Sequence, residues 1–346
     1  MRPLAIVVTV LVLLGAACGN DNSDKNAALT GARADTSVSG SVTVTGSSTV
    51  EPVSSLAGEA FRGQNDEVDV SVEGPGTGDG FERFCEGGAD VTGASRPIKP
   101  EELERCTADG IDVIELAIGL DGVAVITSPD NPVECLTFAD LYALIGVEAE
   151  GVGRWDEAEE LARELGSTTE LPDERLVLTG PGEESGTYDA FIEIVLKTAG
   201  ESRVEAGTIT EEQAATTRVD YAASANDNTI VEGVAADTGG LGWVGLSYAE
   251  QADDVAIIPV AREPEGSCVT PNRETVQDGT YPISRDLYIY VSATAAERPE
   301  VAAFVDFYLA GLADFLELTD YIEQADPEAT VERWDARTTG PAAPET

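Results

Sequence analysis

The sequence predicts an α/β fold with mostly parallel sheets, and its length of 346 residues fits two lobes or domains. Two observations support this class. Segments with the alternating pattern of strands recur along the chain, each followed by a segment with helical spacing, and strands that alternate with helices form parallel sheets. Hydrophobic residues make up 42% of the chain, which is enough for a sizeable core.

In the first third of the chain, residues 41–45 ("SVTVT") alternate as a strand, and a helix then begins near Pro52. A second strand covers Val68–Gly74. A short helix follows with Phe81, Phe84 and Cys85 on one side, and a further strand, turn and helix come after it. The apolar run 111–128 is the longest, and we expect Gly119–Gly122 to break it.

Further along, "ERLVLTGPGEESGT" is a strand that enters a loop, and a helix with an apolar stripe follows from Tyr188. Residues 285–292 ("RDLYIYVS") form a strand, and 298–318 form a strongly amphipathic helix. We expect residues 337–346, rich in Pro and Ala, to be a disordered tail.

Charge and composition exclude several functions. The chain has 65 Asp and Glu against 20 Lys and Arg, a formal charge of −45, which argues against nucleic acid as a partner. High salt is one explanation of the acidity, and an ordinary acidic surface is another. Histidine is absent, which excludes Ser–His and Cys–His nucleophiles and His-ligated metals. We therefore expect no enzyme, cofactor or metal.

The N-terminus has the pattern of an export signal. Arg2 precedes a short apolar region, Leu4–Leu14, and "LLGAAC" then ends at Cys18 like a bacterial lipobox. Gly15 stands where a leucine is usual, so ordinary signal cleavage remains an alternative. We expect residues 1–18 to be a lipoprotein signal peptide acylated at Cys18, and residues 19–39 to be a flexible tether. The protein would then sit on the outer face of the cytoplasmic membrane, or in the periplasm.

Four further cysteines remain, and four cysteines allow three pairings. Disulfides persist outside the cell. We expect the local pairs Cys85–Cys106 and Cys135–Cys268, although the sequence alone leaves the pairing open. A metal site is the weaker alternative, because no C-x-x-C spacing is present.

Four loops share one design, in which a strand ends, small residues with hydroxyls follow, and a helix begins. They are "GSSTVEP", "GPGTGDGF", "GASRPIKPEE" and "GPGEESGTYDAF". In an open α/β sheet such loops gather at the carboxyl ends of the strands, and helix N-termini bind anions. A single Ser or Thr before a helix is most often only an N-cap. Four such loops, one with Arg96, favour a site for a small oxyanion.

With "DGTYPISRDLYIYV", these loops resemble the substrate-binding component of phosphate ABC importers, the PstS family, in order over residues 41–291. The resemblance implies a two-lobed periplasmic-binding-protein fold (type II) with a hinge of two crossing segments, placed near Ala117–Val123 and Pro282–Tyr288. Lobe 1 would comprise residues 40–118 and 284–336, and lobe 2 residues 119–283. It also implies a phosphate-binding, monomeric protein with membrane permease subunits as partners.

The resemblance assigns binding roles position by position. The matching residues are Thr49 and Val50, Thr77 and Gly78, Ser95 and Arg96, and Ser185, Gly186 and Thr187. Ser185 would donate a hydrogen bond to phosphate and would not act as a nucleophile. Ser48, Asp79 and Asn228 are weaker candidates.

Two departures from the family pattern matter. Pro181 stands where better-known relatives carry an arginine, so Arg96 must supply the main positive charge, and Arg96→Ala should weaken phosphate binding more than the loss of any Ser or Thr. Asp79 replaces a glycine of nearby relatives. It either favours the helix dipole or accepts the proton of hydrogen phosphate, which would reject sulfate.

We therefore expect an extracellular, high-affinity phosphate-binding lipoprotein that delivers phosphate to an ABC importer by cleft closure. A binder or sensor of another tetrahedral oxyanion, without transport, is the alternative. A surface adhesin would leave the four donor loops unexplained.

Overall fold

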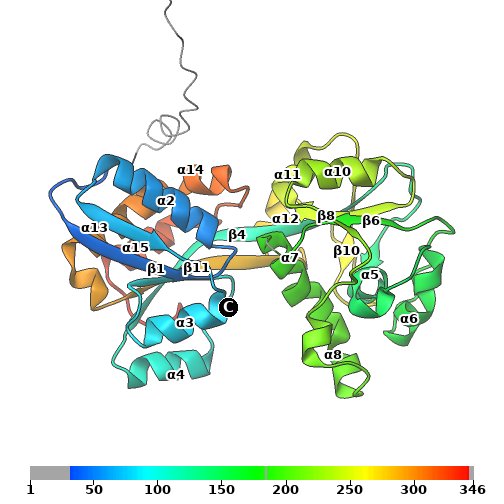
Figure 1. The fold of residues 1–346 in the computed structure, drawn as a ribbon, viewed down its shortest axis with the longest axis horizontal. Helices are drawn as coiled ribbons and strands as arrows, with labels where there is room; N and C mark the ends of the chain where they lie inside the picture. Colours follow the sequence, from blue (N-terminus) through cyan, green and yellow to red (C-terminus); the bar gives the residue numbers. More distant parts are fainter. Residues whose placement is uncertain (1–31, 184, 343–346) are drawn as a thin grey trace, which may run out of the picture.

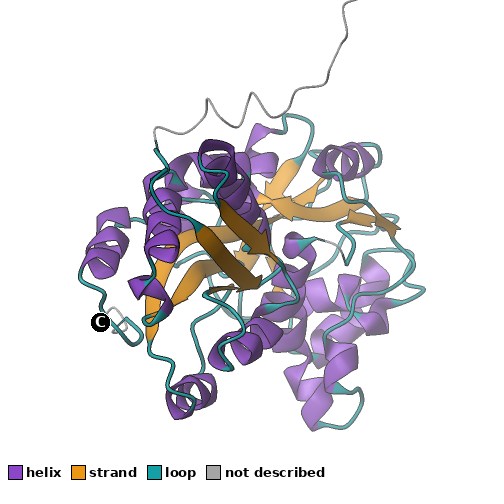
Figure 2. Ribbon diagram, turned by 60° about the vertical axis from the view of Figure 1, so that its left-hand side comes forward, coloured by secondary structure: helices purple, strands orange, loops and turns teal. Residues whose placement is uncertain are grey.

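The computed structural model describes residues 32–183 and 185–342 and has two α/β lobes joined by long strands (Figure 1). The predicted α/β class and the two-lobed arrangement are confirmed. Cys18, the signal peptide and most of the expected tether lie outside the described residues. Helices lie on both faces of the sheets (Figure 2), as strands buried on both sides require.

Lobe 1 contains the first strands of the chain and its C-terminal helices. Its strands run in the order β2-β1-β3-β11-β4, and they are β1 (Gly40–Gly46), β2 (Val68–Val72), β3 (Val91–Ala94), β4 (Val113–Thr127) and β11 (Ser284–Ser292). Its helices are α2 (Glu51–Gln64), α3 (Thr77–Cys85), α4 (Pro100–Ala108), α13 (Pro299–Ala310), α14 (Leu312–Leu318) and α15 (Pro327–Asp335), with a 3-10 turn η4 (Ala295–Glu297).

Lobe 2 is formed by the middle of the chain. Its sheet continues from β4 through β8 (Gly240–Gly245), β6 (Val177–Gly180) and β7 (Ala222–Ala223), with β9 (Ala256–Ile258) beside β4 and a separate pair, β5 (Leu136–Thr137) and β10 (Val260–Ala261). Its helical segments are α5 (Phe138–Ile145), η1 (Val147–Ala149), η2 (Asp156–Ala158), α6 (Glu159–Glu164), α7 (Gly186–Phe191), η3 (Ile192–Leu196), α8 (Lys197–Glu205), α9 (Glu211–Ala214), α10 (Asp227–Ala235), α11 (Leu246–Gln251) and α12 (Arg273–Gln277).

The two crossing segments are the strands β4 and β11, which run antiparallel. Residues 113–122 of β4 pair with β11 in lobe 1, and residues 123–127 pair with β8 in lobe 2. The expected break at Gly119–Gly122 is wrong, because β4 passes through it as one strand. The glycines serve close packing: a Cβ on Gly119 would lie 2.7 Å from the Leu316 side chain.

A third segment, residues 319–326, also lies along the hinge. Ile322 and Leu120 exchange two backbone hydrogen bonds, at 2.8 and 2.9 Å. Lobe 2 holds the same segment through Ser247 Oγ, which donates to the Asp320 carbonyl oxygen at 2.9 Å, and through Gln277, which donates to that of Glu323 at 2.8 Å. The hinge therefore has a third segment that contacts both lobes, in addition to the two crossing segments expected from the sequence.

Both ends of the described chain are more ordered than the sequence suggested. Asn65 donates to the carbonyl oxygens of Asp35 and Val38, so the end of the expected tether packs on lobe 1. Gly340 donates its N–H to Val113 at 2.7 Å, which places part of the expected disordered tail against β4. The N-terminal end also packs Ala32 and Val38 on the lobe 1 core, whereas the C-terminal end is held by a backbone hydrogen bond to β4.

The disulfides follow the expected local pairing. Cys85–Cys106 joins α3 to α4 in lobe 1, and Cys135–Cys268 closes a separation of 133 residues in lobe 2. Each lobe has its own apolar core, with Phe61 and Phe304 buried in lobe 1 and Trp243 and Phe191 stacked in lobe 2. Among the described residues, no helix is long and apolar enough to cross a membrane.

Candidate functional site

Three of the predicted binding loops meet where Gly46, Gly80 and Gly93 touch one another. Gly46 has a φ of +125°, which side chains rarely adopt, and a Cβ there would lie 2.1 Å from the Gly93 carbonyl oxygen. A Cβ on Gly80 would lie 2.4 Å from the Gly46 Cα. Because no side chains intervene, the ends of β1 and β3 and the start of α3 converge.

The second and third loops present hydroxyls beside the start of α3. This helix has no side-chain cap, because its capping position is Gly76. The first N–H groups of any helix lack intrahelical acceptors and form the positive end of the helix dipole. In α3 these are the N–H groups of Thr77 and Gly78. Thr77 Oγ1 lies 3.2 Å from Ser95 Oγ and accepts the Ser95 N–H at 3.3 Å. The two loops thus form one cluster of donors.

The first loop places Thr49 where the lobes meet. Thr49 is 1% exposed, and its carbonyl oxygen accepts the Tyr321 hydroxyl at 2.8 Å. Gly186 of the fourth loop packs directly on it, since a Cβ on Gly186 would lie 3.0 Å from the Thr49 Cα. The Val50 N–H, which the resemblance implies as a ligand donor, gives its hydrogen to the Ser47 carbonyl oxygen at 3.1 Å.

The fourth loop opens α7 in lobe 2. Ser185 is the N-cap of that helix, and its Oγ accepts the Thr187 N–H at 3.2 Å. Because the hydroxyl accepts this bond, its own hydrogen remains for donation to a ligand. Ser48 of lobe 1 donates to Asp189 Oδ2 of α7 at 2.5 Å, so the rims of the two lobes are joined directly.

Arg96 lies on the third loop but is held within lobe 1. Its guanidinium makes two hydrogen bonds to the Glu102 carboxylate, at 2.8 and 2.7 Å, and one to the Pro97 carbonyl oxygen. It also lies over the Phe81 ring, 5.6 Å from the centroid. The hydrogen bonds to Glu102 raise the pKa of Arg96. Its charge is therefore already balanced by one carboxylate.

A second arginine, Arg285 of β11, also reaches this site and was not among the residues predicted from the sequence. Its side chain is 8% exposed, pairs with Asp121, and reaches both Thr49 and Gly186. The signal was present in the sequence: Asp121 and Arg285 are charged residues inside apolar strand patterns. A buried charge in such a place needs a partner, and each supplies the other.

The weaker candidates lie at helix starts. Asp79 is exposed in the first turn of α3. Asn228 is exposed in the first turn of α10, where its N–H donates to the Asn226 side chain at 3.0 Å. These positions fit the turn and dipole roles considered above, and ligand contact by either residue stays a prediction.

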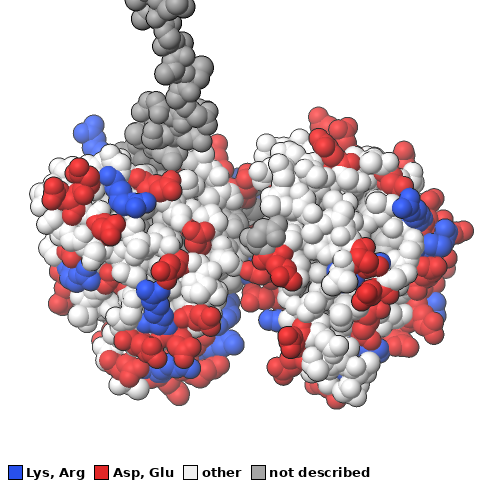
Figure 3. Space-filling view, viewed as in Figure 1, with Lys and Arg blue, Asp and Glu red and all other residues white. Residues whose placement is uncertain are grey.

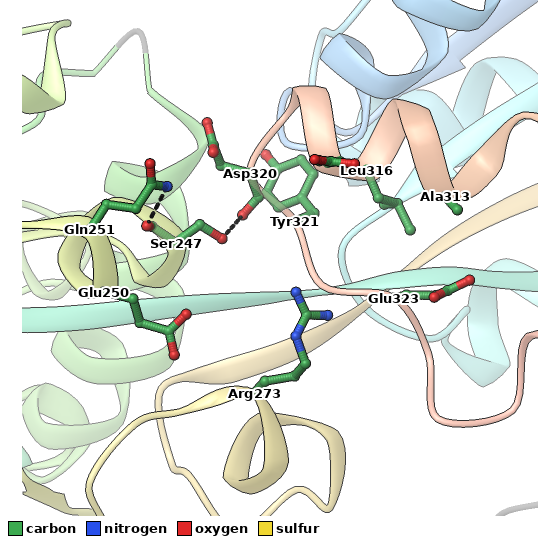
Figure 4. Close-up of a pocket in the computed structure, with 10 residues that line it drawn as sticks. Ser247, Glu250, Gln251, Arg273, Ala313, Leu316, Asp320, Tyr321 and Glu323 are labelled. Carbon is green, nitrogen blue, oxygen red and sulfur yellow. Dashed lines mark hydrogen bonds between the residues drawn. The ribbon is translucent and has the colours of Figure 1, made fainter. Parts of the chain in front are cut away.

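A pocket of about 390 Å³ lies at the hinge, between α14 and residues 319–326 on one side and α11 and α12 on the other (Figure 4). Its walls carry Glu250, Asp320 and Glu323 with Arg273. None of its ten lining residues belongs to the four predicted loops, so it is separate from the site built above. The space-filling view shows mostly acidic charge on both lobes and a hollow between them (Figure 3).

Fold and site together define a class: a two-lobed ligand-binding protein whose facing rims carry hydroxyls, helix N-termini and arginines, a set suited to an anion. Comparison with known proteins agrees with this class. The PBP superfamily domain matches residues 31–311. Protein SphX of Synechococcus elongatus is 39% identical over 270 residues, covering 78% of this chain and 73% of the relative.

Two further comparisons narrow the family. Phosphate-binding protein PstS of Staphylococcus saprophyticus is 32% identical over 282 residues, covering 81% of this chain and 76% of the relative. The crystal structure of a possible phosphate binding protein from Planctomyces limnophilus has a TM-score of 0.74 at 35% identity, covering 86% of this chain and 99% of that one. The chain belongs to the PBP superfamily and, within it, to the PstS family of substrate-binding proteins, which are not enzymes.

Proposed function

We propose that this chain is an exported lipoprotein that binds inorganic phosphate with high affinity between its lobes and delivers it to the permease of an ABC importer. The observation that carries the proposal is the convergence of four loops from both lobes. Thr49 lies against Gly186, and Thr77 lies against Ser95. The names of the Staphylococcus and Planctomyces relatives support phosphate as the ligand.

The donors suit a tetrahedral anion with four oxygens. Ser and Thr hydroxyls and the N–H groups at the start of α3 are the donors of one lobe, and the hydroxyls around Ser185 are those of the other. Charge-assisted hydrogen bonds contribute about 1.5–3 kcal/mol each. Several of these, less the costs of desolvation and closure, reach the −8 kcal/mol or so that micromolar affinity requires. The lobes would close on the ligand by bending at the hinge.

Calorimetric titration of the purified protein with phosphate, arsenate and sulfate tests the ligand. We expect phosphate to bind at micromolar concentration or below. If Asp79 accepts the proton of hydrogen phosphate in the bound state, sulfate should bind at least about a hundredfold more weakly, because it offers no proton to that acceptor. Thr77→Val should weaken phosphate binding. Thr107→Val, on the exposed side of α4, is the matched control and should leave phosphate affinity unchanged. Equal affinity for sulfate would favour a general oxyanion binder, and no binding of any anion would contradict the proposal.

The lipid anchor has a separate test. Cys18→Ala should move the protein from the membrane fraction to the soluble exported fraction without changing its affinity for phosphate. If the wild-type protein is already released after cleavage, the segment is an ordinary signal peptide.

A further inference from the structure

Arg285 occupies a fixed position at the hinge. Its Cα pairs with that of Asp121 in the β4–β11 ladder, and its Nε donates to Asp121 Oδ2 at 3.2 Å. The two side chains are only 8% and 4% exposed. A guanidinium held by a buried carboxylate on the neighbouring strand keeps both its charge and its direction.

From this position the guanidinium reaches both lobes. Nη2 donates to Thr49 Oγ1 of lobe 1 at 2.7 Å and to the Gly186 carbonyl oxygen of lobe 2 at 3.2 Å. Nη1 donates to Glu193 Oε2 of lobe 2 at 2.8 Å. Thr49 and Gly186 are the two predicted ligand residues at which the lobes touch. Arg285 is therefore bonded to the binding loops of both lobes through one side chain.

The bond to Thr49 has a chemical consequence for an anion. The hydroxyl uses its oxygen to accept from the guanidinium, so its own hydrogen is left for an acceptor. A hydroxyl that accepts from a cation is also a stronger donor. A phosphate oxygen at Thr49 is such an acceptor, with the positive charge one hydrogen bond behind it.

We propose that Arg285, supplied by the hinge strand β11, is the arginine on which the phosphate site depends most, because it fixes the Thr49 hydroxyl as a donor while Asp121 and Glu193 hold the guanidinium in place. It is a positioning residue that acts through the Thr49 hydroxyl, and its bonds to Gly186 and Glu193 link lobe 2 to the same charge. The inference rests on the proposed function. It reverses the ranking expected from the sequence, because the Arg96 guanidinium is bonded to Glu102 and Pro97 within lobe 1, whereas Arg285 is bonded to the Thr49 hydroxyl. It also accounts for Pro181, since an arginine of the hinge takes the place of the one missing from the fourth loop.

Phosphate titration of four variants of the full chain tests the ranking. Arg285→Gln should weaken phosphate binding by about tenfold to a hundredfold, the range for one charge-assisted hydrogen bond. Arg285→Lys keeps the charge but loses the fork, and should recover part of the affinity. Arg96→Gln should cost less than Arg285→Gln. Arg218→Gln, which removes another buried, ion-paired arginine from lobe 2, should lower the melting temperature and leave phosphate affinity within about twofold.

A double-mutant cycle with Thr49→Val tests the route through the hydroxyl. If Arg285 acts through Thr49, the double variant should bind little more weakly than the weaker single variant; additive losses would overturn that route. An Arg285→Gln affinity within threefold of wild type, or a larger loss in Arg96→Gln, would overturn the assignment. Should Arg285→Gln not fold, an unchanged affinity in Arg285→Lys decides against it as well. Wild-type protein that binds no phosphate would instead overturn the proposed function, and the inference with it.

Discussion

Lobe 1 and lobe 2 present their helices to the ligand cleft in different ways. In lobe 1, α3 begins at Gly76 without a side-chain cap. Helix α2 also lacks a side-chain cap, but the N–H groups of Val50 and Glu51 already donate to the Ser47 carbonyl oxygen. In lobe 2, α7 and α10 begin with caps, provided by Ser185 and Asn226. A capped helix has already satisfied part of its N–H donors, whereas an uncapped one keeps them for a ligand. The start of α3 in lobe 1 therefore offers more N–H donors than the starts of α7 and α10 in lobe 2.

The largest effect should come from disturbing the contact that assembles lobe 1. In Gly46→Ala the new Cβ would lie 2.1 Å from backbone at a φ of +125°, so we expect a loss of more than about 3 kcal/mol in the free energy of unfolding and no measurable phosphate binding. Urea unfolding and calorimetry provide the two measurements. Gly63→Ala in α2, with no atom within 4 Å of its Cβ, is the control and should be neutral or stabilising. A fully stable Gly46→Ala protein would contradict the account of lobe 1.

The matching substitution in lobe 2 should affect binding alone. A Cβ on Gly186 would lie 3.0 Å from Thr49, an atom of the other lobe. Gly186→Ala should therefore leave the unfolding free energy within about 1 kcal/mol of wild type, while phosphate affinity falls by about thirtyfold because closure is obstructed, a change of about 2 kcal/mol. Gly153→Ala, in a lobe 2 loop, is the control. Unchanged affinity in Gly186→Ala would show that the lobes need not meet at this point.

Closure should also depend on pH, through Asp227 of lobe 2 and Asp320 of the third hinge segment. Burial, and then the charge of Asp320, raises the pKa of Asp227 to about 6, and burial raises the pKa of Asp320. The pKa of Tyr248 in α11 is also raised, first by burial and then by the charges of Asp320 and Asp227. An ionised Asp227 disfavours the closed arrangement above pH 6, and protonation removes that cost as the pH falls.

If Asp227 has its ordinary pKa of 3.8 when the lobes separate, closure should become about tenfold more favourable between pH 7 and pH 5. Phosphate itself titrates in this range, so the measurement is the difference between wild type and Asp227→Asn in phosphate affinity at the two pH values. The variant should lack the additional tenfold change. Glu232→Gln, an exposed carboxylate on the same helix, should behave as wild type. If phosphate affinity depends on pH in the same way in Asp227→Asn and wild type, Asp227 and Asp320 do not control closure.

The smallest effect should come from the bond between the rims. Ser48→Ala removes the hydrogen bond to Asp189, which lies in a partly exposed position. We expect phosphate to dissociate about threefold faster, close to 0.7 kcal/mol, with no change in unfolding free energy. Stopped-flow dissociation measures this, and a rate equal to that of wild type would mean that the bond adds nothing to closure.

Much of this architecture was predictable because local patterns determined it. Alternation identified β1 and β2, the proline at the start of α2 marked its first turn, and the local cysteine pairing proved correct. The break expected in β4 was wrong, because glycine weakens a strand in general but here admits Leu316 and the backbone at residue 322. Such packing depends on residues 200 positions away in the chain and leaves no local signal.

The candidate site also contains residues that local patterns predict and residues that only long-range contacts reveal. The hydroxyl loops were identified because Ser, Thr and Gly before a helix form a recognisable local motif. Arg285 was missed because it lies in a strand, and its bonds to Thr49 and Gly186 span 236 and 99 positions of sequence. Arg96 was ranked first from its position in a loop. Only the structure reveals that Glu102 of the following helix neutralises it.

The third hinge segment restricts how the lobes can move. Two strands side by side could bend and also rotate about their common axis, whereas residues 319–326 add a third connection, held to β4 at Ile322 and to lobe 2 at Ser247. Three adjoining connections leave bending as the soft degree of freedom and resist torsion. If the lobes open and close around a ligand as proposed, the two halves would return to the same alignment at every cycle, and Arg285 at the pivot would meet the same partners each time.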